Sequence, residues 1–188
     1  MNRRTWLFLW LGWPLIVVPA AVWEFRYWSG ESSEPLALHL KDWDGHERSL
    51  EDFRGKVVMV YFGYTRCPEA CPLEFFRLSR VMKQLGAARA RVQVLFITLD
   101  PDRDTPQLLK AYLNVFDSGF LALSGSTTDI ASAARTFHVI YVRTPAGNDY
   151  FIDHTSVTYL IDKQGYLRFR EPPSADTEDY IRHLNQLL

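Results

Sequence analysis

The chain has only two cysteines, Cys67 and Cys71, and three residues separate them. Outside the cytoplasm, cysteines usually form disulfides that stabilise small folds. A disulfide across so short a loop would add little, because the stabilisation falls as the closed loop shrinks. Two reduced thiolates would instead attack the disulfide of a partner or bind a soft metal ion, Cu(I) or zinc. The pair is therefore a candidate metal-binding or redox site.

The two cysteines are predicted to lie between a buried strand and a helix. Residues 57–62 form a continuous apolar run, typical of a strand that is buried on both faces. From Phe75 to Leu85, apolar residues recur at spacings of three and four, as in an amphipathic helix. Pro68 and Pro72 both suit a first helical turn, so the helix is expected to begin just after one of the cysteines. The positive end of the helix dipole would then favour thiolates.

The order of the remaining elements indicates an α/β fold. Strands are predicted at 92–99, 120–123, 155–161 and 166–169, helices at 106–116, 126–137 and 176–188, and hairpins near 36–49 and 140–149. Such an order predicts a central mixed sheet flanked by helices, parallel in its first half and antiparallel in its second. A thioredoxin-like domain has this order.

A metal held by two sulfur atoms alone would be exposed, so a third ligand is expected. His154 directly precedes the last predicted strand pair. On a thioredoxin plan, the first strand of this pair runs beside residues 57–62 and begins near the cysteines. The residues alone leave a purely structural role for His154 open, and His138 is a weaker candidate ligand. The other histidines are expected to have surface or packing roles; they are His39, His46 and His183.

The N-terminal segment is expected to anchor the chain in a membrane. Residues 5–23 carry no charge, and their number approaches the roughly 20 that cross a bilayer as a helix. Arg3 and Arg4 precede this run, which predicts an N-terminus on the cytoplasmic side. A cleaved signal peptide is the alternative and leads to the same compartment.

We therefore expect three parts: residues 1–28 as a cytoplasmic tip and transmembrane anchor, 29–35 as a linker, and 36–188 as one folded domain. The domain would lie on the outer, periplasmic side of the cytoplasmic membrane. The chain has 21 basic and 22 acidic residues, a balance that argues against a nucleic-acid partner.

Three motifs, in this order, resemble the signatures of the Sco/SenC proteins. They are Tyr-Phe-Gly-Tyr-Thr-Arg-Cys-Pro-Glu-Ala-Cys-Pro at 61–72, Leu-Asp-Pro-Asp-Arg-Asp-Thr-Pro at 99–106 and Asp-His-Thr-Ser at 153–156. The resemblance implies a thioredoxin-like fold in which Cys67, Cys71 and His154 bind copper, as Cu(I) with Cu(II) as an alternative. It also implies a role in assembling the copper A centre of cytochrome c oxidase, by carrying copper or by reducing the target cysteines.

The implied partners are the copper A-containing subunit of the oxidase, a copper donor and a thiol reductant. On this interpretation the protein is a copper chaperone rather than an enzyme. A membrane-anchored thiol:disulfide oxidoreductase and a redox or copper sensor are the alternatives, since both would use the same cysteine pair. Reductases of this fold usually have C-x-x-C and peroxiredoxins have Thr-x-x-Cys, and the chain has neither.

Two acidic features near these motifs have open roles. Residues 100–104 are expected to form a solvated turn in which Asp104 or Thr105 caps the next helix, and a role in copper transfer or docking is the alternative. Asp153 could orient His154 through a hydrogen bond, although adjacent side chains in a strand point to opposite faces.

Overall fold

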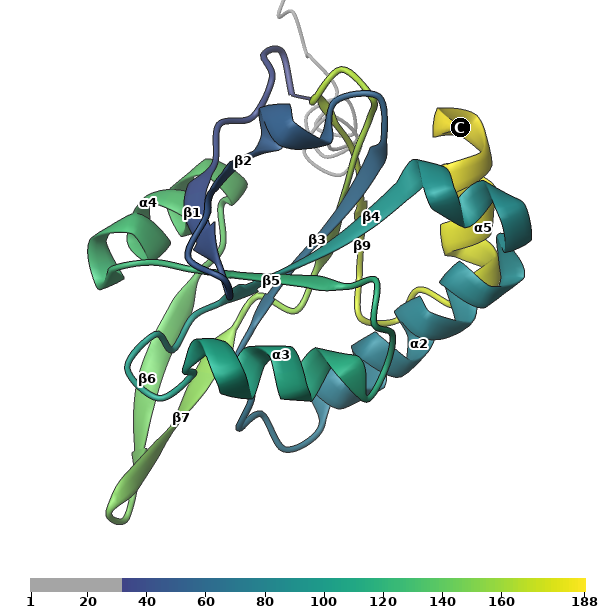
Figure 1. Ribbon diagram of the computed structural model, residues 1–188. Coiled ribbons are helices and arrows are strands. Elements are labelled where there is room, and N and C mark those ends of the chain that lie inside the picture. The colour runs from purple at the N-terminus through teal and green to yellow at the C-terminus, as the bar shows by residue number, and fades with distance from the viewer. Residues whose placement is uncertain (1–31) are drawn as a thin grey trace, which may run out of the picture.

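The computed structural model describes residues 32–188, which form a seven-stranded mixed sheet with helices on both faces (Figure 1). The strand order is β2-β1-β5-β4-β3-β8-β9, and β6 pairs with β7 in a separate hairpin. Neighbours among β3, β4 and β5 are parallel, and the other neighbouring pairs are antiparallel. The predicted central mixed sheet is confirmed. The strands are β1 (His39–Asp42), β2 (Glu47–Ser49), β3 (Val57–Gly63), β4 (Val92–Thr98), β5 (Leu121–Ser124), β6 (Tyr141–Ala146), β7 (Asp149–His154), β8 (Thr158–Ile161) and β9 (Leu167–Glu171).

The sheet divides the core into two layers, and helices cover the layer on each face. One layer packs under three helices, with Leu78, Leu113 and Leu184 among its buried residues; the other packs under a single helix through Ile130 and Phe137. The three helices are α2 (Ala70–Gln84), α3 (Pro106–Asn114) and α5 (Thr177–Leu187), and the single helix is α4 (Thr127–Phe137). Short 3-10 helices lie at η1 (Leu50–Phe53) and η2 (Gly86–Arg91).

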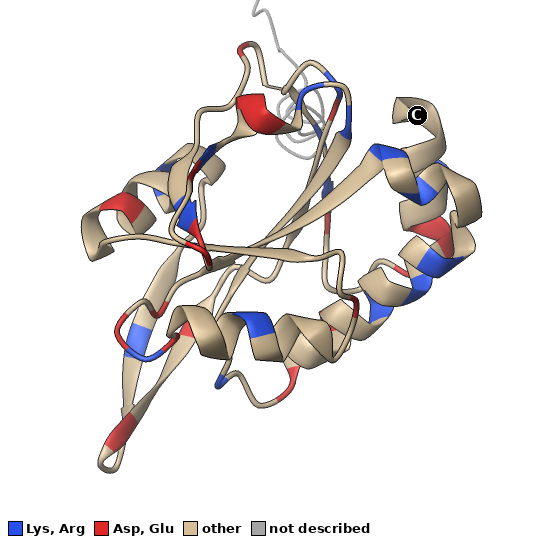
Figure 2. Cartoon of the chain, in the orientation of Figure 1, with Lys and Arg blue, Asp and Glu red and all other residues tan. Residues whose placement is uncertain are grey.

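β3 is an interior strand of the sheet, between β4 and β8, and is buried along its whole length. Successive side chains alternate between the two layers, so Met59 faces α2 and Val60 faces the opposite side. Figure 2 shows charged residues on helices, turns and the β6–β7 hairpin and none along the middle of β3 and β4, because neither face of these two strands offers solvation to a charge. The carboxyl ends of β3 and β4 meet at one edge, and pairing of Tyr61 with Thr158 brings the chain before β8 to the same edge.

Two elements near the cysteines differ in detail from the prediction. α2 begins at Ala70, so Cys71 lies in its first turn and Cys67 lies in the loop before it. The hairpin predicted near 140–149 is present, but its second strand continues to His154. Cys67 therefore follows the end of β3, and His154 precedes the start of β8 at the same edge of the sheet.

The expected membrane anchor, residues 5–23, lies outside the described residues. Within residues 32–188, no helix combines the length and the apolar character needed to span a bilayer. At the start of the described chain, the Ser32 N–H donates to the Leu167 carbonyl and the Leu36 N–H to the Gly165 carbonyl, both at 3.0 Å. The chain is thus already hydrogen-bonded to the β8–β9 region within the stretch expected as a linker.

Glu74 is a buried carboxylate that joins three elements. Its Oε1 accepts hydrogen bonds from the hydroxyl of Thr158 in β8 at 2.7 Å and from that of Tyr180 in α5 at 2.5 Å. Arg77, one turn further along α2, forms an ion pair with it. Because both hydroxyls are buried, each depends on this acceptor.

We expect Glu74→Ala to lower the free energy of unfolding by about 2–4 kcal/mol, since it leaves two buried hydroxyls without an acceptor. Glu74→Gln keeps a side-chain oxygen there and should be less destabilising. Urea denaturation measures both, with Glu47→Ala, which removes an exposed ion pair, as the control. Equal effects of Glu74→Ala and Glu47→Ala would contradict this role.

Candidate metal-binding site

Cys67, Cys71 and His154 come together at the carboxyl end of β3. One potential ligand atom from each residue lies within 4.8 Å of the other two, and the distance between Cys71 Sγ and His154 Nε2 is 3.7 Å. Ligand atoms at about 2.0–2.3 Å from one ion are at most about 4.6 Å apart. The three residues therefore need only a slight contraction to share a metal ion.

The other histidines lie elsewhere. His138, the weaker candidate, is exposed at the left-handed C-cap of α4. His183 forms an ion pair with Glu171, while His39 lies at the start of β1 and His46 in the turn after it. Among the described histidines, only His154 groups with the cysteines.

Cys67 is the more accessible thiol and is strongly acidified. It is half-buried, and its Sγ accepts a hydrogen bond from the backbone N–H of Cys71 at 3.4 Å. That N–H belongs to the first turn of α2, where backbone donors have no partner within the helix. Hydrogen bonds from the Cys71 thiol and then from backbone N–H groups lower the pKa of Cys67 to about 4. Cys67 is therefore a thiolate at neutral pH.

Cys71 is fully buried, and the pKa of its thiol is raised rather than lowered. Its hydrogen bond to Cys67 stabilises the protonated thiol, and burial together with the nearby Cys67 charge raises its pKa further. Two thiolates this close in a low-dielectric site repel each other. The metal-free pair consequently holds one negative charge and one proton, and a bound cation would replace that proton.

The ring of His154 is oriented by the backbone. Its Nδ1 lies 3.1 Å from the Thr155 carbonyl oxygen, which can only accept, so Nδ1 carries the proton and Nε2 presents its lone pair toward Cys71. Tyr61 and Tyr64 contact the ring edge-to-face at 6.1 and 6.2 Å between centroids. These contacts fix the imidazole in a ligand-ready tautomer.

Asp153 does not orient His154. Its Oδ2 accepts a hydrogen bond from the Thr144 hydroxyl at 2.6 Å, across the hairpin. As expected for neighbours in a strand, its side chain points to the face opposite His154.

Gly63 is a requirement of the site that the motif did not reveal. A Cβ at this position would lie 2.6 Å from Cys71 Sγ and 3.2 Å from the Phe96 ring. Its backbone angle is not of the kind that requires glycine, so space alone excludes a side chain. The only signal in the sequence is a glycine directly after a buried strand and before a cysteine loop.

Residues 100–104 contain the expected turn, but only its middle is solvated, and the carboxylates at its two ends are buried. Thr105 caps α3, as one of the two alternatives predicted, by accepting from the Leu108 N–H. Asp104 is buried instead, and accepts hydrogen bonds from Thr65 N–H at 3.0 Å, Thr65 Oγ1 at 2.5 Å and Thr98 Oγ1 at 2.6 Å. This carboxylate thus ties the end of β4 to the loop that carries Cys67.

A cavity of about 580 Å³ opens beside the three candidate ligands. Cys67 and His154 form part of its wall, and Leu73 of α2 and Phe151 of β7 line it while remaining about half exposed. The cavity gives a second molecule access to one side of the ligand set.

The SCO1/SenC family matches residues 34–188, which include the three candidate ligands. The chain belongs to the SCO1/SenC family. Among curated SCO relatives, the human mitochondrial SCO2 homolog is 40% identical over 132 residues, covering 68% of this chain and 50% of the relative. The chain spans between half and two thirds of the length of the curated relatives that it matches.

Two solved structures of Sco proteins share the architecture. Bradyrhizobium japonicum ScoI with copper bound has a TM-score of 0.76 and 32% identity, covering 83% of this chain and 100% of that one. BsSco, described as having a disulfide switch and as a member of the Sco family of cytochrome c oxidase assembly proteins, has a TM-score of 0.67 and 25% identity, covering 84% and 94%. The thioredoxin-like fold predicted for the domain is confirmed.

The two thiols should titrate far apart. In the reduced, metal-free protein, ultraviolet thiolate absorbance should rise by one thiolate with a midpoint near pH 4, because Cys67 gains hydrogen bonds as it ionises. The second thiolate should form only in strongly alkaline solution, and Cys67→Ser should abolish the acidic step. A first step near the ordinary thiol pKa of about 8.5 would contradict this assignment.

Gly63→Ala should displace Cys71. Overpacking of this kind lowers the free energy of unfolding by about 1–3 kcal/mol, and the displaced thiol should react faster with an alkylating reagent. Gly119→Ala is the matched control, since its Cβ would meet only the ends of the Asp117 and Arg89 side chains, at 3.2 and 3.5 Å. An unchanged free energy of unfolding and an unchanged alkylation rate in Gly63→Ala would show that a Cβ at residue 63 does not displace Cys71.

Proposed function

We propose that this chain is a copper-binding assembly factor for the copper A centre of cytochrome c oxidase. It holds one copper ion with Cys67, Cys71 and His154. The observation that carries the proposal is the convergence of two sulfur atoms and one imidazole within 4.8 Å. Two thiolates and an imidazole are soft to borderline ligands that favour Cu(I) and also accommodate Cu(II).

The relatives support the same assignment. Bradyrhizobium japonicum ScoI has a structure with copper bound, and BsSco is described as belonging to a family of cytochrome c oxidase assembly proteins. Their similarity covers more than four fifths of this chain, and the family match at residues 34–188 includes all three ligands. A chaperone requires no turnover of a small substrate, so we assign a non-enzymatic role.

Copper loading follows from the protonation states of the pair. The accessible Cys67 thiolate is the first ligand to meet an incoming ion, and Cys71 then exchanges its proton for the metal. His154 completes the set through Nε2. A three-ligand site leaves one side of the ion toward the cavity, where ligands of the recipient can bind copper before these residues release it.

Only the reduced pair supplies two thiolates, so a disulfide between Cys67 and Cys71 blocks Cu(I) binding. Loading therefore depends on a thiol reductant as well as a copper donor. The same acidic, accessible Cys67 beside a buried second thiol is also suited to reducing cysteines of the copper A-containing subunit. Copper delivery and reduction are thus two forms of one assembly role, and they respond differently to loss of His154.

We further assign residues 1–28 as a membrane anchor, residues 29–35 as the linker and residues 36–188 as the functional domain on the periplasmic side. This assignment rests on the uncharged run at 5–23 and the arginines before it. It would hold the copper site near a recipient that is itself a membrane protein.

The roles of the ligands can be tested in cells. Cys67→Ser, Cys71→Ser and His154→Ala should each lower the amount of active copper A-containing oxidase at wild-type levels of the variant protein. For copper delivery, added copper should partly restore oxidase in His154→Ala, because this variant keeps the dithiol. The control is His39→Ala, which removes an exposed histidine that does not group with the cysteines.

A different pattern would indicate reduction as the main task. His154→Ala would then be nearly normal, both cysteine variants would fail, and added reductant would rescue them better than copper. Normal oxidase in all three ligand variants would contradict the assembly role altogether.

A further inference from the structure

The hairpin that carries His154 is separate from the main sheet. β6 and β7 pair only with each other among the described strands, and most of their residues are exposed or half-buried. An isolated two-stranded hairpin is marginally stable in water. The position of His154 relative to the two sulfur atoms therefore depends on what fastens this hairpin to the domain.

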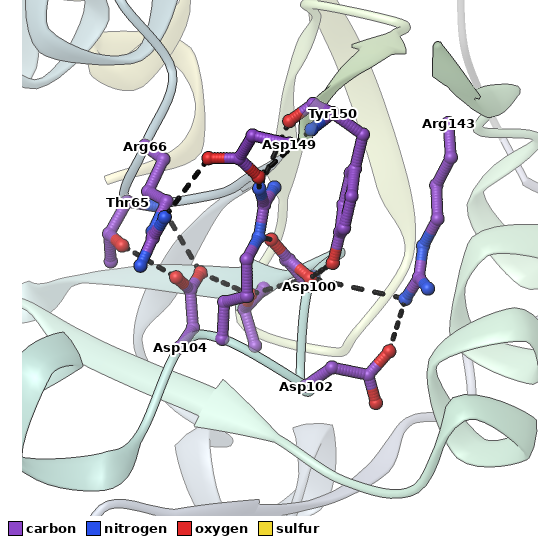
Figure 3. A network of polar contacts seen from close by, with 10 residues as sticks. Thr65, Arg66, Asp100, Asp102, Asp104, Arg143, Asp149 and Tyr150 are labelled. Atoms are coloured by element: carbon purple, nitrogen blue, oxygen red, sulfur yellow. Dashed lines mark hydrogen bonds and ion pairs between the residues drawn. The ribbon is translucent and has the colours of Figure 1, made fainter. Parts of the chain in front are cut away.

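Residues 100–104, called here the 100–104 bridge, hold the hairpin by several polar contacts (Figure 3). Asp100 Oδ1 accepts a hydrogen bond from the Tyr150 hydroxyl at 2.7 Å. Arg103 forms an ion pair with Asp149, donates to the Tyr150 carbonyl at 3.0 Å, and stacks on the Tyr150 ring with its Cζ 3.5 Å from the centroid. Asp149 and Tyr150 are the first two residues of β7, the strand that ends at His154.

The bridge also holds the loop that carries the cysteines. Asp104 accepts both the backbone N–H and the hydroxyl of Thr65, which lies two residues before Cys67. Arg66, the next residue, reaches Asp149 directly at 3.2 Å. The 100–104 bridge therefore contacts both the loop that carries Cys67 and the β6–β7 hairpin that carries His154.

Three of the four charged side chains of the bridge are withdrawn from water, and Asp102 alone among them is exposed. Asp100 and Asp104 are 0% and 1% exposed, and the Arg103 side chain, which also forms an ion pair with Asp100, is 13% exposed. Within the described residues, Arg103 Nη2 is buried without a hydrogen-bond acceptor, so this cation depends on the remaining contacts. Buried ion pairs contribute little net stability, because desolvation offsets their attraction, but they restrict geometry.

We propose that the 100–104 bridge is a positioning element that sets the distance between His154 and the two thiols, and thereby the copper affinity of the site. Asp100, Arg103 and Asp104 act through the side chains they hold and do not themselves bind the metal. The proposal rests on the proposed function, because it requires His154 to be a copper ligand.

The test weakens the contacts between the bridge and β7 with two conservative changes and leaves the ion pair of Arg143 in β6 with Asp102 in place. Asp149→Asn weakens the ion pairs to Arg103 and Arg66, and Tyr150→Phe removes the hydroxyl bonded to Asp100 while keeping the stacked ring. Cu(I) affinity is measured on the reduced protein by competition with a chromophoric chelator. We expect the double variant to bind Cu(I) about tenfold more weakly, the lower end of the range for partners that orient metal ligands.

A double-mutant cycle with His154→Ala separates positioning from a general structural role. If the bridge acts through His154, the two hairpin changes should have no further effect on Cu(I) affinity in the His154→Ala background. A merely structural role would lower affinity by the same factor in both backgrounds and would overturn the proposal. Asp117→Asn, which weakens an Arg–Asp pair remote from the site, is the control and should leave affinity unchanged.

The remaining outcomes distinguish the two claims. Wild-type affinity in the hairpin double variant, together with a loss in His154→Ala, would overturn the positioning role and leave the copper site intact. Wild-type affinity in His154→Ala would overturn the ligand assignment and the positioning role together.

Discussion

The sulfur atoms of Cys67 and Cys71 lie close together at the carboxyl end of β3, and the arrangement of the residues around them depends on this proximity. Cys71 lies so close to the β3 backbone that residue 63 has space only for glycine. Cys67 lies against the first turn of α2, and its sulfur atom accepts a hydrogen bond from the backbone N–H of Cys71, which has no partner within the helix. The pair is close and buried enough to hold only one negative charge without a cation. A bound soft cation relieves this restriction, because it allows both sulfur atoms to be thiolates.

The sequence predicted the candidate ligands of the site better than the residues that hold those ligands in position. A buried apolar run followed by helical periodicity placed the cysteines between strand and helix, because these two periodicities are strong signals. The pairing of β8 with β3 then brought His154 to the same edge, as the thioredoxin-like order indicated. The start of α2 was less certain, since Pro68 and Pro72 both suit a first turn, and the observed start at Ala70 lies between them.

The contacts that hold the ligands in position join residues that are distant in the sequence. Asp104 bonds to Thr65, 39 residues earlier, and Asp100 to Tyr150, 50 residues later. A run rich in aspartate before a helix is usually solvated, so nothing local indicated burial. Gly63 was missed for a related reason, because its close approach to Cys71 depends on how helix and strand pack. The buried carboxylates thus restrict the geometry of a site that the motifs only locate.

The central claim is that both thiols and the imidazole bind one copper ion. X-ray absorption at the copper edge of the Cu(I)-loaded, reduced protein tests it most directly, with His154→Ala measured beside the wild type. The account predicts two sulfur neighbours and one nitrogen neighbour in the wild type, with the nitrogen lost in the variant. A wild-type spectrum without the nitrogen, or a nitrogen that persists in His154→Ala, would contradict it.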